Sequence, residues 1–271
     1  MAAVLIGTFG ALVGSFLNVV VYRVPRGLSV AYPSSACGSC AHPIRPWDNI
    51  PIASWLVLRG RCRDCAAPIS LRYPLVELAG AIAFAAVAWR FLPNFSAAEG
   101  GLQVAAAVVE LVAYLYFVAI GVALALIDLD THRLPNAIVL PAYPVSVALL
   151  GTSAALSGQL QPVLTALAGF ALLGGLYLVL ALVKPNGMGM GDVKLAGVIG
   201  LFLGWLGLPT LAVGAIAVSL LGGIVAAVML LAGKGGKHAV PFGPILLSGA
   251  WVGILFGDPI AVAYLSLFGI T

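Results

Sequence analysis

The chain has 271 residues, of which 62% are hydrophobic and 8% are charged, and its mean hydropathy is +1.13. Soluble domains carry about 25% charged residues, so this composition excludes an ordinary soluble protein and predicts an all-α polytopic membrane protein. The formal net charge is only +4, and the arginines lie beside apolar segments without interleaved aromatic residues, so we expect no nucleic-acid partner.

Apolar segments along the chain predict about eight transmembrane helices of ~20 residues each. The first, 1–22, has no basic start and no small-residue cleavage site, so we expect a retained helix rather than a removable signal peptide. Residues 23–73 are rich in Pro, Cys, Arg and Ser and form the one segment that could fold outside the bilayer. Residues 74–271 are expected to form a seven-helix membrane domain with spans near 74–91, 102–127, 137–150, 162–183, 192–205, 210–231 and 242–266. The uncharged stretch 151–161 is predicted to be a loop.

The distribution of basic residues predicts which side of the membrane each connection faces, because cytoplasmic connections carry an excess of lysine and arginine. If 23–73 lies in the cytoplasm, Arg90 alone lies towards the opposite face. All other lysines and arginines are then cytoplasmic, namely Arg23, Arg26, Arg45, Arg59, Arg61, Arg63, Arg72, Arg133, Lys184, Lys194, Lys234 and Lys237.

Four cysteines, Cys37, Cys40, Cys62 and Cys65, form two C-x-x-C pairs within the polar segment. Each pair can present two thiolates on one turn, and two such turns can close a tetrahedral zinc site. The segment is too small to form a large hydrophobic core, so we expect a structural metal ion to stabilise its fold. The alternative is four unmetallated thiols with a redox role, which a reducing cytoplasm disfavours. A catalytic zinc would need an open coordination position, which four cysteine ligands do not leave.

Two aspartates lie at the ends of apolar runs. Asp128 closes the run 122–127, and Asp192 follows the glycine-rich stretch 187–191. Ionisable groups at membrane depth are costly, and two carboxyls facing each other across a water form the dyad of an aspartyl protease. The alternative is that each aspartate caps a helix or pairs with an arginine at the interface, which we favour for Asp130. The sidedness above puts Asp128 and Asp192 at the cytoplasmic ends of their spans.

The residues around Asp192 suggest a place for a substrate. Gly189 and Gly191 give the pattern G-x-G-D, and glycine allows a substrate strand to approach the backbone closely. Lys194 could lower a carboxyl pKa or anchor its helix to lipid headgroups. We assign Gly189, Gly191 and Lys194 a substrate-positioning role. Glu110, inside the third span, is expected to bond to a neighbouring helix.

Taken together, these motifs resemble those of the type IV prepilin peptidase family, a group of bifunctional leader peptidases and N-methyltransferases. The resemblance extends over most of the chain, and its motifs follow one another in the family's order. They are GSFLNVVVYRVP at 14–25, the cysteine pairs, RPWDNIP at 45–51, RGRC at 59–62, ISLRYPLVE at 69–77, IDLDTHRLPN at 127–136 and GMGDVK at 189–194.

The resemblance implies an eight-span membrane protein of the bacterial inner membrane with a cytoplasmic zinc-bearing insert. Asp128 and Asp192 match the catalytic aspartates of the family. The implied substrates are prepilins and pseudopilins of pilus or type II secretion machinery, cleaved after a basic leader at the cytoplasmic face of the lipid bilayer. The new N-terminus would then be methylated from S-adenosylmethionine. No residues for that methyl donor emerge from the sequence, although Glu77 could help bind it, pair with an arginine or cap a helix.

Two other functions would use some of the same features. A G-x-G-D intramembrane protease of other membrane helices would explain the aspartates but not the cysteine insert or the 14–25 motif. A transporter with a zinc-ribbon docking domain would explain acids within the membrane but not the glycine pattern beside Asp192.

Overall fold

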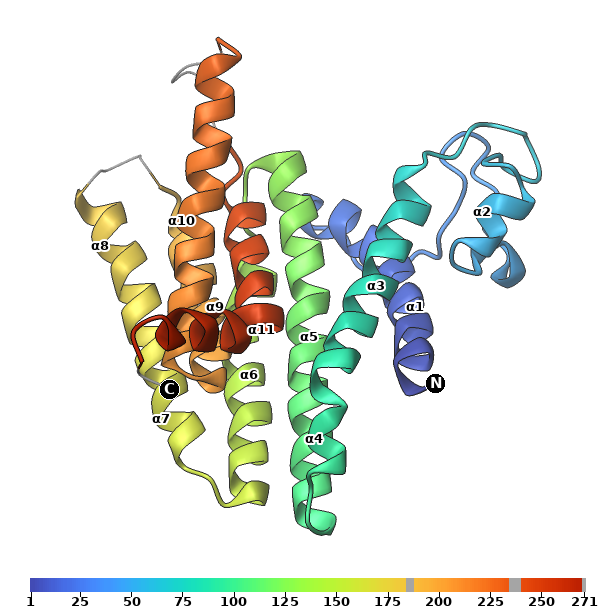
Figure 1. Cartoon of the computed structure of the whole chain (residues 1–271). Helices are drawn as coiled ribbons and strands as arrows, with labels where there is room; N and C mark the ends of the chain where they lie inside the picture. The colour runs from blue at the N-terminus through green and yellow to red at the C-terminus, as the bar shows by residue number, and fades with distance from the viewer. Residues whose placement is uncertain (184–187, 234–239, 270–271) are drawn as a thin grey trace. The chain divides into compact units, whose positions relative to one another are not determined.

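The computed structural model describes residues 1–183, 188–233 and 240–269, and these residues are built mainly of helices (Figure 1). Over these ranges the structure has no named strand and two isolated β-bridges, both within 23–73. The prediction of an all-α protein is therefore confirmed. Lys184, Lys234 and Lys237 of the predicted cytoplasmic set, and Gly187 of the glycine-rich stretch, lie outside the described residues.

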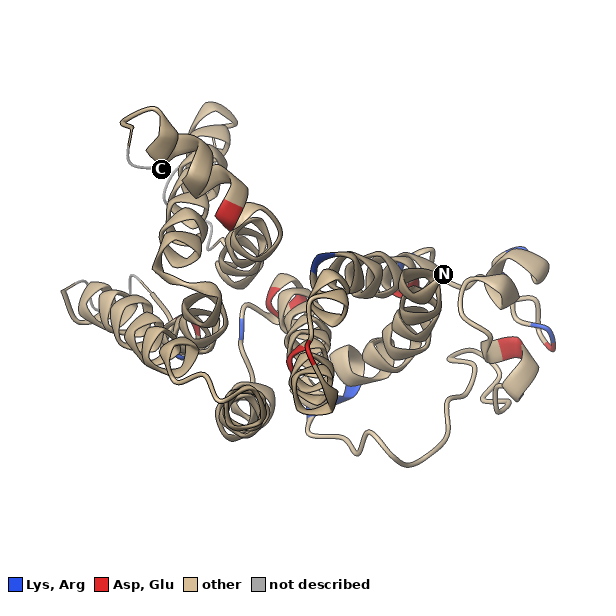
Figure 2. Ribbon diagram, turned by 60° about the horizontal axis from the view of Figure 1, so that its bottom comes forward, with Lys and Arg blue, Asp and Glu red and all other residues tan. Residues whose placement is uncertain are grey.

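Seven helical segments of the described chain are long and apolar enough to cross a membrane, and charged residues are sparse along them (Figure 2). They are Ala2–Arg26, Arg72–Ser96, Gly101–Thr131, Asn136–Ser157, Gln161–Val183, Leu208–Leu231 and Gly243–Ser266. The remaining expected span, 192–205, is the sixth in chain order and corresponds to a shorter helix of 17 residues, α9 (Met190–Leu206).

The chain divides into two compact units. The first comprises Met1–Ser96 with Val118–Ala123, and the second comprises Ala97–Phe117 with Leu124–Thr271.

In the first unit, α1 (Ala2–Arg23) packs along α3 (Arg72–Phe91), and small residues allow the two backbones to approach closely. A Cβ atom on Gly10 would lie 2.5 Å from the carbonyl oxygen of Gly80, and one on Gly80 would lie 2.6 Å from that of Gly10. Between these helices come three short helical turns, and α4 follows α3. Their bounds are η1 (Val24–Arg26), η2 (Pro46–Asn49), α2 (Ala53–Val57) and α4 (Pro93–Ser96).

The second unit is built around α9, whose residues from Val193 to Trp205 are almost all buried. Its other elements are most of α5 (Gly101–Thr131), α6 (Asn136–Ser157), α7 (Gln161–Gly169), the π-helical turn η3 (Phe170–Gly174), α8 (Gly175–Val183), α10 (Leu208–Leu231) and α11 (Gly243–Ser266). All of these except α5 are among the closest neighbours of α9. A central helix packed by protein on many sides needs little lipid-facing surface, which accounts for its short length.

Glycines set the packing of α9 against α7. A Cβ on Gly200 would overlap the carbonyl oxygen of Gly169, and a Cβ on Gly169 would overlap that of Gly200. Two helices can touch backbone to backbone only where both lack side chains, so this pair fixes the register of α9 and therefore the height of Asp192.

Two predicted boundaries were wrong. The loop expected at 151–161 is helical as far as Ser157, and α6 ends where Gly158 adopts a left-handed φ of 69°. Residues 151–157 contain no proline, and Ala154, Ala155 and Leu156 are good helix formers, so the helix continues through them despite Gly151. At the other boundary, α5 runs on to Thr131, so Asp128 lies within its last turns rather than after its end.

Candidate active site and metal centre

Asp128 lies near the C-terminal end of α5 and is only 5% exposed. The backbone N–H of Gly243 donates a hydrogen bond of 2.8 Å to Oδ2 of Asp128. Gly243 is the first residue of α11, and N–H groups in the first turn of a helix have no partner within that helix. The carboxyl of Asp128 thus meets the positive end of α11, where a negative charge is stabilised.

Asp192 lies in the first turn of α9, which begins after Gly189. Its backbone N–H donates to the carbonyl oxygen of Gly189 at 3.0 Å, and its carboxyl reaches back to the backbone of the same glycine. Asp192 therefore also occupies the positive end of a helix, and its side chain is held against the turn that precedes it.

The two carboxyls belong to the same unit and lie close enough to interact electrostatically. Leu134, in the connection between α5 and α6, lines the space beside them. A Cβ on Gly191 would lie 2.9 Å from Cβ of Leu134, and a Cβ on Gly243 would lie 3.3 Å from its Cδ2 and 2.9 Å from Oδ2 of Asp128. The structure thus brings Asp128, Leu134, Gly191, Asp192 and Gly243 together.

The sequence suggested that Lys194 interacts with a carboxyl or with lipid headgroups, but its side chain contacts a different group. Its ammonium donates to the side-chain oxygen of Asn136 at 3.0 Å, and its carbonyl oxygen accepts a 2.6 Å hydrogen bond from the hydroxyl of Tyr143. Both partners lie on α6, so Lys194 holds the first turns of α9 against that helix.

Two neighbours of the aspartates were missed by sequence reasoning. Gly243 follows Phe242 in the sequence PFGP at 241–244, where the prolines could have indicated a helix start with free N–H groups. Tyr177 is buried, interacts electrostatically with Asp192, and has its ring centroid 6.1 Å from that of Phe242. Tyr177 lies in a uniformly apolar run, which offers no signal that would distinguish it.

Glu110 behaves as expected from the sequence. Its carboxyl accepts a 2.8 Å hydrogen bond from the indole N–H of Trp205 on α9. The predicted bond to a neighbouring helix is therefore present.

The four cysteines form a candidate metal centre in the first unit. Their Sγ atoms all lie within 4.8 Å of one another, and those of Cys37 and Cys65 are 3.8 Å apart. Sulfurs placed tetrahedrally at ~2.3 Å from a zinc ion are ~3.8 Å apart, so the donor set has the size and chemistry to hold such a metal.

The two cysteine loops share one backbone conformation. In the first, the N–H of Cys37 donates to the carbonyl of His42, and Ala41 adopts a left-handed φ of 59°. The second loop repeats this pattern, with the N–H of Cys62 donating to the carbonyl of Ala67. Both carry the sequence Cys-x-x-Cys-Ala-x-Pro-Ile, a short internal repeat that presents one pair of thiols from each loop.

Ion pairs join the second cysteine loop to the segment after the first. Arg63 donates to both carboxylate oxygens of Asp48, with distances of 2.6 and 2.9 Å, and Arg45 pairs with Asp64 at 3.0 Å. The hydrogen bonds from Arg63 hold the pKa of the Asp48 carboxyl below its ordinary value.

Glu77 anchors the insert to α3. Its carboxylate is buried, 8% exposed, and accepts a 2.7 Å hydrogen bond from the N–H of Ile52. Ile52 has φ 62° and ψ −51°, and the N–H of Ala53 bonds the carbonyl of Pro51 across it at 2.6 Å, which forms a γ-turn of the rare, strained kind. This bond holds the 46–53 loop against α3, a role that differs from the three suggested by the sequence.

Comparisons with known proteins match two regions of the chain, one that contains the cysteine loops and one that contains the aspartates. A model of the bacterial peptidase A24 N-terminal domain matches residues 8–91, and a model of the type IV leader peptidase family matches residues 115–231. A prepilin leader peptidase/N-methyltransferase of Aeromonas hydrophila is 36% identical, over 97% of this chain and 94% of its own length. Proteins of the same name from Pseudomonas aeruginosa and Neisseria gonorrhoeae are 37% and 36% identical, over 96% and 93% of this chain.

The chain belongs to the type IV leader peptidase family. This confirms the resemblance seen in the sequence motifs, and nothing in the comparisons favours a transporter or a protease of another group. As a leader peptidase of this family, the chain carries the cysteine loops within its N-terminal match and both Asp128 and Asp192 within its C-terminal match. No solved structure matches the chain.

Proposed function

We propose that this protein is a membrane aspartyl endopeptidase that removes the basic leader from type IV prepilins and pseudopilins and then N-methylates the new N-terminal residue. Family membership and the names of the relatives support both activities. The observation that supports the peptidase activity is that the Asp128 and Asp192 carboxyls, at the starts of α11 and α9, lie close enough to interact electrostatically.

The proposed hydrolysis needs one ionised and one protonated carboxyl. The ionised group takes a proton from water as the water oxygen bonds to the scissile carbonyl carbon, and the protonated group gives its proton to the carbonyl oxygen. When the C–N bond breaks, its electron pair goes to nitrogen, which takes a proton from the carboxyl that received it first. Re-formation of the carbonyl returns the other proton, so no covalent intermediate with the enzyme is required.

Burial and hydrogen bonding fit this division of roles. Two nearby carboxylates resist double ionisation, so we expect them to share a proton. The N–H of Gly243 and the N-terminal ends of the two helices favour keeping one negative charge there. We assign Gly189 and Gly191 to substrate approach, and Lys194 to holding α9 in place through Asn136.

From the way a prepilin lies in the membrane, we infer that the reaction occurs at the cytoplasmic face of the bacterial inner membrane. A prepilin has a basic leader that stays in the cytoplasm and a hydrophobic helix that stays in lipid, so its scissile bond lies at the interface. The arginine-rich insert supports the same orientation. The substrates would come from pilus or type II secretion machinery.

Zinc is the metal we assign to the cysteine quartet. Four thiolates with tetrahedral spacing and no open position favour a structural zinc ion that holds the two loops together. This ion would take no part in either reaction.

Methyl transfer would use S-adenosylmethionine. The lone pair of the new N-terminal amine forms a bond to the methyl carbon, the carbon–sulfur bond breaks with its electron pair going to sulfur, and the amine releases a proton to solvent. We place this activity in the N-terminal region, residues 8–91, which precedes the peptidase region.

The test is incubation of the purified protein with a synthetic prepilin and S-adenosylmethionine, followed by mass spectrometry of both products. The parent protein is expected to cut after the basic leader and to add one methyl group. Asp128→Asn and Asp192→Asn should each reduce cleavage by at least ~10³-fold, because either carboxyl alone lacks its partner in proton transfer. Glu110→Gln, a carboxyl change within the same unit, should cleave normally. Cleavage by either aspartate variant at the parental rate would exclude the proposed dyad.

A further inference from the structure

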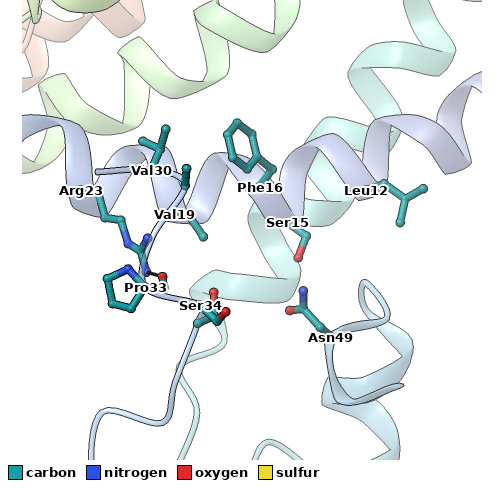
Figure 3. Close-up of a pocket in the computed structure, with 11 residues that line it drawn as sticks. Leu12, Ser15, Phe16, Val19, Arg23, Val30, Pro33, Ser34 and Asn49 are labelled. Carbon is teal, nitrogen blue, oxygen red and sulfur yellow. Dashed lines mark hydrogen bonds between the residues drawn. The ribbon is translucent and has the colours of Figure 1, made fainter. Parts of the chain in front are cut away.

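A pocket of about 280 Å³ opens in the first unit between α1 and the two segments that follow it (Figure 3). Ser15 and Val19 come from one side of α1, Ser34 from the loop after η1, and Asn49 from the end of η2. All residues of the pocket lie within 12–49. They belong to the N-terminal match at 8–91 and not to the match at 115–231, which carries the aspartates.

The lining of the pocket combines apolar and polar groups. Phe16 and Val19 contribute an apolar helix surface, and the hydroxyls of Ser15 and Ser34 and the amide of Asn49 point towards one another (Figure 3). A few convergent polar groups on an apolar wall are typical of small-molecule sites. A volume of about 280 Å³ lies just below the range for such sites, ~300–1,000 Å³, and suits a small ligand about as large as a nucleoside.

Arg23 adds a positive charge at one end of the pocket. Its guanidinium donates to the carbonyls of Ser29 at 3.0 Å and Pro33 at 2.6 Å, which fixes the loop that carries Ser34. A guanidinium has five N–H donors, so these two bonds leave capacity for a carboxylate.

The opposite wall is also held in place. Asn49 belongs to the loop that Glu77 fastens to α3 through the N–H of Ile52. Two separate anchors, Arg23 and Glu77, therefore keep the polar walls of the pocket facing α1, which lowers the entropy cost of binding a ligand.

We propose that this pocket binds the adenosyl portion of S-adenosylmethionine. The hydroxyls of Ser15 and Ser34 and the amide of Asn49 match the ribose hydroxyls and the hydrogen-bonding edge of adenine. Arg23 matches the carboxylate of the amino-acid portion, and the apolar wall matches the purine face. The assignment rests on the proposed methyl transfer, and it locates that activity in a different unit from the aspartates.

The test uses the full-length protein in detergent, with tritiated S-adenosylmethionine and S-adenosylhomocysteine as probes. Ser15→Leu, which fills the pocket, and Asn49→Ala, which removes an amide, are each expected to weaken binding of both probes at least tenfold. Thr8→Leu is the matched control, because Thr8 is exposed on the same helix and bonds only the carbonyl of Val4. Prepilin cleavage should be unchanged in all three variants, which shows that they are folded.

The outcomes separate this proposal from the proposed function. If the parent binds both probes and the pocket variants bind them equally well, the pocket is not the donor site, although methyl transfer stands. If the parent binds neither probe and adds no methyl group, both the pocket assignment and the methyl transfer fail, while leader cleavage can still stand. If the variants keep donor binding but lose a co-purified anionic phospholipid, the pocket is a lipid headgroup site and the proposal is overturned.

Discussion

Asp128 and Asp192 share one kind of local environment, in which a carboxyl meets the N-terminal end of a helix. For Asp128 that helix is α11, and the contact depends on Gly243, whose N–H donates to the carboxylate at 2.8 Å. Gly243 also has no Cβ, and this allows Asp128 to approach as closely as it does. The position of the carboxyl therefore depends on the absence of a side chain on a residue far away in the sequence.

Gly243→Ala is expected to reduce leader cleavage by at least ~10-fold, because the added Cβ would lie 2.9 Å from Oδ2 of Asp128 and displace the carboxyl. The measurement is kcat/KM on a synthetic prepilin. Gly223→Ala is the control, since a Cβ at Gly223 meets nothing within 4 Å, and it should cleave at the parental rate. Equal activity of both variants would contradict the role given to Gly243.

The close contact of α7 with α9 decides where Asp192 lies relative to its surroundings. The helices touch at Gly169 and Gly200, and the same central helix is packed by α6, α8, α10 and α11. Because interiors resist overpacking, one methyl group at this contact must move a helix rather than a single side chain.

Gly200→Ala is expected to destabilise the protein by about 1–3 kcal/mol, because its Cβ would overlap the backbone of Gly169. Thermal unfolding in detergent should show a lower Tm. Gly175→Ala provides the comparison, since a Cβ there meets nothing within 4 Å and its Tm should match that of the parent. An unchanged Tm for Gly200→Ala would mean that α7 and α9 do not approach as closely as described.

The insert between α1 and α3 depends on different forces. It has two short cysteine loops, two ion pairs and the bond from Ile52 to Glu77, and it has no fully buried side chain of its own. Such a segment gains little from apolar burial, so a metal held by four thiolates would supply much of its stability.

Protein purified without oxygen is expected to contain about one zinc ion per chain. Cys62→Ser should lose the metal and make the segment 24–71 more sensitive to protease, whereas Ser39→Ala, which changes a residue between two of the ligands, should keep both metal and resistance. Metal analysis and limited proteolysis report these two properties independently. Absence of zinc from the parent would refute the assignment.

The proposed function requires the aspartates to face the cytoplasm, because the leader of a prepilin is made and must be cut on that side of the membrane. Lysines and arginines are concentrated in the insert and in connections on the same predicted side, with Arg90 as the exception. The seven long apolar helices of the described chain, with the short α9 at the centre of the second unit, are compatible with that orientation.

A membrane-impermeant maleimide is expected to label the four insert cysteines in inverted membrane vesicles treated with a chelator, and not in intact cells. Asn94→Cys should show the opposite pattern, because the connection at 92–101 is predicted to face away from the cytoplasm. Labelling of the insert from outside intact cells would reverse the proposed orientation.

The sequence by itself determined the membrane class, the succession of apolar spans, the family, the four clustered cysteines and the pair of aspartates to examine. These follow from local properties, since hydropathy, the spacing of cysteine pairs and short motifs are fixed within a few neighbouring residues. Only the tertiary structure decided four features: the electrostatic interaction of the two candidate catalytic carboxyls, the hydrogen bond of Asp128 with Gly243, the electrostatic interaction of Asp192 with Tyr177, and the pocket bounded by Ser15, Ser34 and Asn49. Each of these features joins residues from different segments of the chain. Their positions depend on how closely the helices approach and in which register they pack, and no single stretch of sequence specifies that packing.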